Sequence, residues 1–152
     1  MPLVGVLVGS ASDKETVQHT MDTLAQFGVE AELTVASAHR NPDAVRAYVE
    51  EAPARGVEVF VAAAGGAAAL PGVVASLTTL PVIGVPLASS ELKGVDALYS
   101  VVQMPPGIPV ATVAIGSWGA RNAAILATQI LALKYASLRE ALEAHRQRLR
   151  ER

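Results

Sequence analysis

Strand-like and helix-like segments alternate along the whole chain, and this alternation restricts the fold more than any other feature of the sequence. Most of the short apolar runs, which are typical of buried strands, are followed by a segment with a helical pattern or a helix-start signal. The expected strands span residues 3–8, 30–36, 57–63, 81–85 and 110–115, and the expected helices span residues 12–28, 42–52, 67–77, 119–135 and 136–152. Such an order predicts a parallel sheet with helices on both faces.

We therefore expect a single α/β domain over residues 1–152. Its fold class is a three-layer α/β/α sandwich with a central parallel sheet, flavodoxin-like, plus a C-terminal helix. The chain is long enough to bury a core. Hydrophobic residues make up 51% of the chain but aromatic residues only 4%, so the core must be built from Ala, Val, Leu and Gly. Side chains this small let helices and strands approach one another closely.

Charge and cysteine content narrow the choice of partners and compartment. The formal net charge of −2 gives no support for a nucleic-acid or membrane-surface partner. The chain has no cysteine, which excludes disulfides and thiolate chemistry and fits a reducing compartment. The N-terminal residues Met1–Val4 lack the charged region of a signal peptide. We therefore expect a cytoplasmic protein.

Two long segments, residues 59–90 and 97–120, carry no charged side chain. Glycine and proline interrupt the first, which is rich in alanine, whereas a membrane span needs about 20 strongly apolar residues in a row. A small chain exposes much of its surface, so we expect part of these segments to be buried between copies in a homo-oligomer. Helix 136–152 carries Leu138, Leu142 and Leu149 on roughly one face, and we expect it to contact another subunit.

The first candidate loop is Gly-Ser-Ala-Ser-Asp at residues 9–13, between the first strand and the first helix. Hydroxyls and backbone N–H groups at a helix N-terminus can hold phosphate. The alternative is a capping box in which Ser12 or Asp13 only caps the helix. Asp13 would repel phosphate but can accept hydrogen bonds from ribose hydroxyls. The stretch matches neither the P-loop nor the dinucleotide-binding pattern.

The second candidate loop is Ser-Ala-His-Arg-Asn-Pro-Asp at residues 37–43, after the second strand. Asn41 is a good N-cap and Pro42 suits the first helical position, so the loop ends where a helix begins. Ligands of parallel α/β sheets bind outside the carboxyl ends of the strands. Arg40 can hold a phosphate through two hydrogen bonds, and an imidazole such as that of His39 can move protons near neutral pH.

A histidine in such a loop can also simply cap a helix or face solvent. The direct neighbourhood of His39, Arg40 and Ser37 at the ligand edge of the sheet favours the functional interpretation. We therefore take His39 as a candidate acid–base group, and Ser37 and Arg40 as candidate binding residues.

The third candidate loop, residues 64–72, has no reactive side chain. Gly65 and Gly66 allow positive φ and a close approach of the backbone to a planar ligand, although a tight turn alone would also use them. Metal binding is not expected. The three histidines are scattered along the chain, cysteine is absent, and no histidine and carboxylate are paired at a spacing typical of metal ligands. A Ser-His-Asp hydrolase is a poor match, because no Gly-x-Ser-x-Gly elbow is present.

These loops, in this order, resemble those of the N5-carboxyaminoimidazole ribonucleotide mutase family of purine biosynthesis. The resemblance covers almost the whole chain up to about residue 133. It is carried by residues 9–13, 37–43, 64–72, 80–86, 94–105, 107–113 and 122–124.

The resemblance implies a cofactor-free isomerase, in which the carboxylate on the exocyclic nitrogen of the aminoimidazole moves to a ring carbon by decarboxylation and recarboxylation. The family's catalytic histidine corresponds to His39, and its substrate-binding residues correspond to Ser10, Asp13 and Arg40. The backbone of residues 65–68 would enclose the base and the transient CO2. A dry pocket suits this chemistry because escape of CO2 ends the reaction. A homo-octamer is also implied. With the loop residues above, the candidate substrate-binding set is Ser10, Ser12, Asp13, Ser37, Arg40, Gly65, Gly66, Ala67 and Ala68.

Two positions depart from the family pattern. The family often has Trp after the Ser-x-Ser-Asp segment where this chain has Lys14, which we take as peripheral, and it has a histidine before Leu-Pro-Gly where this chain has Ala69. Any proton relay through that second imidazole must therefore be absent, or be replaced by water or by the ligand. Two alternatives to the mutase stay open. One is a carboxylase that joins free CO2 to aminoimidazole ribonucleotide. The other is a catalytically silent ribonucleotide-binding module.

Overall fold

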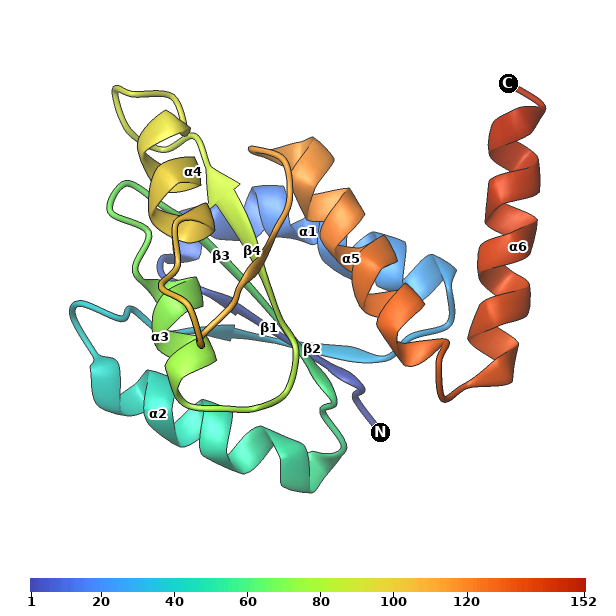
Figure 1. Cartoon of the computed structure of the whole chain (residues 1–152), viewed down its shortest axis with the longest axis horizontal. Helices are drawn as coiled ribbons and strands as arrows, with labels where there is room; N and C mark the ends of the chain where they lie inside the picture. Colours follow the sequence, from blue (N-terminus) through green and yellow to red (C-terminus); the bar gives the residue numbers. More distant parts are fainter.

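The sheet at the centre of the molecule has five parallel strands in the order β2-β1-β3-β4-β5. The four longer strands, β1 to β4, are labelled in Figure 1. This computed structural model describes all 152 residues. The strands are β1 (Val4–Val8), β2 (Ala31–Val35), β3 (Val59–Gly65), β4 (Val82–Leu87) and β5 (Ala111–Thr112). Every residue of β1 and β4 is buried, as expected for continuous apolar runs covered on both faces. The order and the parallel pairing confirm the flavodoxin-like α/β fold.

Helices cover both faces of the sheet and so form the two outer layers (Figure 1). One face carries α1 (Lys14–Gln26) and α5 (Ser117–Leu131), and the other carries α2 (Pro42–Glu51), α3 (Leu70–Ser76) and α4 (Val95–Val102). Neighbouring strand residues serve opposite cores, because side chains alternate along a strand. Val6 packs in the core under α1 and α5, whereas Leu7 packs in the core under α2, α3 and α4.

Helices α1 and α5 pack against each other on one face of the sheet. The face of α5 toward the core is buried and consists largely of alanine, at Ala120, Ala123, Ala124 and Ala127. From α1, the buried Thr20 donates its hydroxyl hydrogen to the Ala120 carbonyl at 2.7 Å. This short contact between a side chain and the opposite backbone agrees with the close helix approach expected from the composition.

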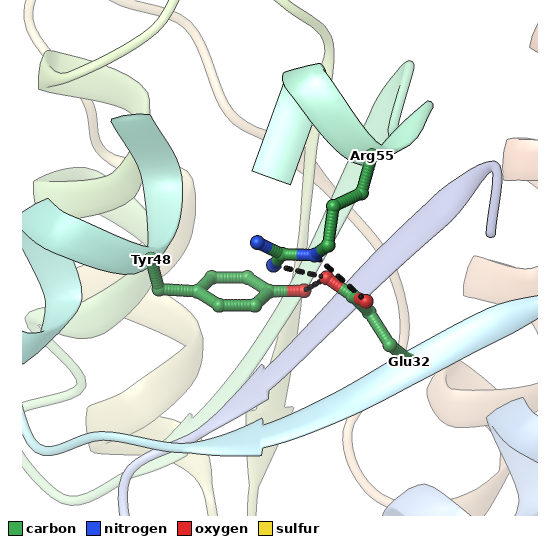
Figure 2. A network of polar contacts seen from close by, with 3 residues as sticks. All are labelled: Glu32, Tyr48 and Arg55. Atoms are coloured by element: carbon green, nitrogen blue, oxygen red, sulfur yellow. Dashed lines mark hydrogen bonds and ion pairs between the residues drawn. The ribbon is translucent and has the colours of Figure 1, made fainter. Parts of the chain in front are cut away.

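A polar network fastens α2 to β2 (Figure 2). Glu32 on β2 accepts hydrogen bonds from the Tyr48 hydroxyl at 2.9 Å and from Arg55 Nη2 at 2.7 Å. The Arg55 guanidinium also lies over the Tyr48 ring, 5.7 Å from its centroid. The hydrogen bond from Arg55 holds the pKa of Glu32 below its usual value. Because α2 begins directly after the loop of residues 37–41, this network also fixes the element that carries that loop.

The structure corrects several expectations about element boundaries. Helix α4 was not among the expected helices, and the strand expected over residues 110–115 pairs only at Ala111 and Thr112. The capping box expected at Ser12 is wrong. A short 3-10 turn (Ala11–Asp13) precedes α1, and it is Ser10 whose hydroxyl accepts the Ser12 N–H, at 3.4 Å.

The C-terminal helix α6 (Ala136–Arg150) lies beyond α5, at the right of Figure 1. Of its apolar stripe, Leu138 is buried in the core under α1 and α5, and Leu142 is partly buried against that core. Leu149 is exposed near the end of the helix. Part of the stripe therefore docks on the chain itself, and contact of α6 with another subunit stays a prediction. No helix combines the length and apolar content that a bilayer crossing requires.

Candidate functional site

A cavity of about 230 Å³ lies at the carboxyl edge of the sheet, where β1 and β3 are neighbours. In sheets with this strand order, the connections diverge to opposite faces at that point and leave a crevice. The cavity is lined by residues that follow or end β1, β2, β3 and β4, and by the start of α3. They are Gly9, Ser10, Ser12, Asp13, Ser37, Ala38, His39, Arg40, Ala64, Gly65, Ala68, Ala69, Leu70 and Ser89.

The loop after β2 forms one side of the cavity and is held by its own hydrogen bonds. The Asn41 backbone N–H donates to the Ser37 carbonyl at 2.8 Å, and the Asn41 side chain accepts the Ala44 N–H at 3.2 Å, which caps α2. The expected N-cap at Asn41 and the helix start at Pro42 are confirmed. His39 projects from this turn as an exposed side chain on the cavity wall.

Arg40 links the loops after β1 and β2. Its Nε and its backbone N–H both donate to the Ser37 hydroxyl, at 3.3 and 3.1 Å, and Nη2 reaches the Gly9 carbonyl at 3.5 Å. All three contacts are to neutral oxygens, and none of the chain's ion pairs involves Arg40. Its positive charge is thus fixed at the cavity but not neutralised, which suits an anionic ligand.

The loop after β1 contributes hydroxyls and a carboxyl group. The hydroxyls of Ser10 and Ser12 lie 2.9 Å apart and share a hydrogen bond. Partial burial raises the pKa of Asp13 above its usual value, and a hydrogen bond from the Ser10 backbone offsets part of this rise. Asp13 is the only acidic side chain among the cavity-lining residues.

The loop after β3 forms a wall without polar side chains. Gly65 ends β3, and the chain turns with the Ala68 N–H donating to the Gly65 carbonyl at 3.0 Å. Gly66 and Ala68 both have positive φ, +61° and +45°. Ala68 is a non-glycine residue in this region, which costs about 1 kcal/mol of backbone strain. The turn thus presents backbone and alanine to the cavity.

All the predicted site residues line this one cavity except Gly66 and Ala67. Ala67 is exposed, at the tip of the turn. Sequence reasoning missed Ser89, which reaches the cavity from the segment after β4. Ala69 lines the cavity as well. No three His, Asp or Glu side chains gather where they could hold a metal ion.

Taken together, the side chains divide the cavity by chemistry. The unpaired guanidinium of Arg40 and three serine hydroxyls lie on the side of β1 and β2, and His39 stands beside them. The residues that line the β3 side have small and mostly apolar side chains. Such a site suits a small molecule with an anionic end and a flat, compact end, next to an imidazole that can transfer a proton.

Comparison with known proteins agrees with this arrangement. A family model described as AIR carboxylase matches residues 3–152. The N5-carboxyaminoimidazole ribonucleotide mutase of Saccharolobus solfataricus is 54% identical over 94% of this chain and 89% of that protein. The mutase of Pseudomonas aeruginosa is 56% identical over 95% and 88%, respectively. The crystal structure of Treponema denticola PurE superposes with a TM-score of 0.90 at 29% identity, covering 99% of this chain and 93% of that one.

Proposed function

Because this chain belongs to the AIR carboxylase family, we propose that it converts N5-carboxyaminoimidazole ribonucleotide to 4-carboxy-5-aminoimidazole ribonucleotide in purine biosynthesis. The relatives named above are mutases of that ribonucleotide, and a mutase is an isomerase. The observation that supports the proposal most directly is the cavity that brings His39 next to the serine hydroxyls and to Arg40, whose guanidinium has no ion-pair partner.

The proposed reaction moves one carboxyl group within the substrate. The bond between the exocyclic nitrogen and the carboxyl carbon breaks and releases CO2, while His39 as general acid protonates that nitrogen. The electron-rich ring carbon then attacks the CO2 held in the cavity and forms the new carbon–carbon bond. His39, now a base, removes the proton from that ring carbon. The proton lent in the first step is regained, so atoms and charge balance without a cofactor.

The proposed binding roles follow the division of the cavity. The guanidinium of Arg40, assisted by the Ser10, Ser12 and Ser37 hydroxyls, would hold the phosphate. Asp13 would accept hydrogen bonds from the ribose hydroxyls. The turn at Gly65 and Ala68 would lie against the imidazole ring and confine the CO2.

Ala69 supplies no proton, so this scheme routes every proton transfer through His39. An octameric assembly and a cytoplasmic location are proposals that rest on the family resemblance and on the sequence.

The proposal is tested by comparing two substrates with purified protein. One reaction contains N5-carboxyaminoimidazole ribonucleotide, and the other contains aminoimidazole ribonucleotide with bicarbonate. Turnover of the first alone supports the mutase. Turnover of the second alone identifies a carboxylase that uses free CO2. Binding of the ribonucleotides without turnover of either identifies a silent binding module, and both of these outcomes contradict the mutase proposal.

Replacing His39 by Asn removes the proton-transfer group but keeps a side chain of similar size. We expect kcat to fall by at least about a hundredfold, while affinity for the ribonucleotide stays within about tenfold. His19, inside α1 and away from the cavity, gives the matched control as His19→Asn. A His39→Asn protein with a near-normal rate would contradict the assigned role.

A further inference from the structure

Ser89 brings the only side-chain hydrogen-bonding group to the β3 and β4 side of the cavity. The other lining residues there, Ala64, Gly65, Ala68, Ala69 and Leu70, have no polar side-chain atoms. Any polar substituent at the compact end of a ligand therefore meets either backbone groups or the Ser89 hydroxyl. None of the roles proposed above uses this residue.

The sheet determines where Ser89 lies. Leu87, the last residue of β4, pairs in register with Gly65, the last residue of β3. Ser89 follows two residues later and so reaches the turn after β3. A Cβ atom added to Gly65 would fall on the Ser89 hydroxyl oxygen and within 3.0 Å of the Ser89 Cβ. The missing side chain at position 65 thus makes the space that Ser89 occupies.

The neighbouring serine fixes the backbone of this segment. Ser90 donates its hydroxyl hydrogen to Asp96 Oδ2 at 2.6 Å, and the same hydroxyl accepts the Leu92 N–H at 3.1 Å. Ser89, in contrast, has no hydrogen-bond partner for its hydroxyl within the chain. One serine is used for structure, and its neighbour leaves a free hydroxyl at the cavity.

We infer that the Ser89 hydroxyl binds the carboxylate that the substrate and product carry at the aminoimidazole end. This inference rests on the proposed function, which puts the ring and the migrating carboxyl group against Gly65 and Ala68. A hydroxyl donor next to an otherwise apolar wall favours a carboxylate, because hydrogen bonds to charged groups are stronger than those to neutral groups. Ser89 would thereby hold the carboxyl group in line with the ring carbon.

The experiment measures binding of two ribonucleotides to the full-length protein and to Ser89→Ala. The carboxylated product, 4-carboxy-5-aminoimidazole ribonucleotide, carries the group in question, whereas aminoimidazole ribonucleotide lacks it. We expect Ser89→Ala to weaken binding of the product by at least about tenfold. Binding of aminoimidazole ribonucleotide should stay within about twofold, because the contacts to its phosphate and ribose are unchanged.

Ser137→Ala on α6 is the matched control, since it removes an exposed serine hydroxyl far along the chain from the cavity. It should change neither affinity. The inference is overturned if Ser89→Ala leaves product binding unchanged, or if it weakens both ligands equally. If the wild-type protein binds the product but does not turn over the mutase substrate, the proposed reaction fails while the carboxylate site stands. If the wild-type protein binds neither ribonucleotide, both proposals fail.

Discussion

At the scale of single residues, Asp13 shows how the cavity sets ligand binding against stability. Burial raises the pKa of its carboxyl group, because removal from water disfavours the charged form. At neutral pH the ionised carboxylate therefore destabilises the folded chain relative to the unfolded chain, in which the group is fully hydrated. A carboxylate that lowers the stability of the ligand-free protein is consistent with a group that forms its hydrogen bonds with a bound ligand, as the proposed ribose contact requires.

Replacing Asp13 by Asn should separate these two effects. At pH 7 we expect the free energy of unfolding to stay the same or to rise, because the variant has no charge to desolvate. Below about pH 4, where the carboxyl group of the unfolded wild type is itself protonated, this advantage should vanish. Ribonucleotide affinity should fall by about tenfold. Urea denaturation at both pH values and titration calorimetry measure these effects, and a clear loss of stability at pH 7 would contradict the explanation.

The site residues differ in how visible they are in the sequence. His39 and Arg40 were identifiable because they stand between a strand and a helix cap, and that position fixes which edge of the sheet they occupy. Ser89 gave no such signal. Its place in the cavity depends on the pairing of Leu87 with Gly65 and on the missing Cβ at Gly65, and neither is a property of the local sequence.

At the scale of elements, the sequence pattern predicted the four longer strands well. β1, β3 and β4 are buried apolar runs, and β2, at the edge of the sheet, is partly buried. Helix α4 was missed because it lacks the usual start signal. Its N-cap is Gly94, in a left-handed conformation with φ of +92° and no side-chain cap. The last strand is shorter than the apolar run from residue 110 to 115, because only Ala111 and Thr112 pair with β4. Beyond them the chain still follows β4 through isolated hydrogen bonds, from the Val113 N–H to the Gly84 carbonyl and from the Gly116 N–H to the Pro86 carbonyl.

The network that joins α2 to β2 offers a test at this scale. Glu32→Gln keeps the shape of the side chain but removes the ion pair with Arg55, and we expect the free energy of unfolding to fall by about 1 kcal/mol at pH 7. The folded-state pKa of Glu32 is lowered, so its contribution is present above the unfolded pKa of about 4.3 and is lost as pH falls through the folded value.

The difference between wild type and Glu32→Gln should accordingly shrink in acid. Chemical denaturation across pH 3 to 7 measures this difference. The control is Glu50→Gln, which removes an exposed ion pair with Arg46 on the surface of α2. A difference that does not depend on pH would show that the ionised form of Glu32 is not what stabilises the contact.

At the scale of the whole molecule, large apolar side chains remain uncovered on the single chain. Trp118 is 76% exposed and Leu133 is 85% exposed, and further exposed apolar residues lie along α4, at Val95, Tyr99 and Val102. The chain therefore presents more apolar surface than isolated exposed residues would explain. This distribution supports the proposed assembly of identical subunits.

We expect the purified protein to sediment as an assembly rather than as a 15.7 kDa monomer. Eight copies would give about 126 kDa. Because the uncovered side chains are apolar, the assembly should persist in about 1 M salt, which screens charge interactions to within about 3 Å. Sedimentation velocity at low and high salt measures this. A monomer in both conditions contradicts the assembly, and dissociation in salt alone shows that charged contacts hold it together.

The buried alanine face of α5 limits how this protein can vary over evolutionary time. In most cores the damaging changes are truncations, which leave voids, but alanine has almost nothing to remove. Here the damaging direction is enlargement, because an added methyl group at these buried positions must displace neighbouring core atoms, and at Ala120 it must displace α1, whose Thr20 already contacts the Ala120 carbonyl. Lineages of this chain should therefore drift freely at its surface while these positions accept only glycine, alanine or serine.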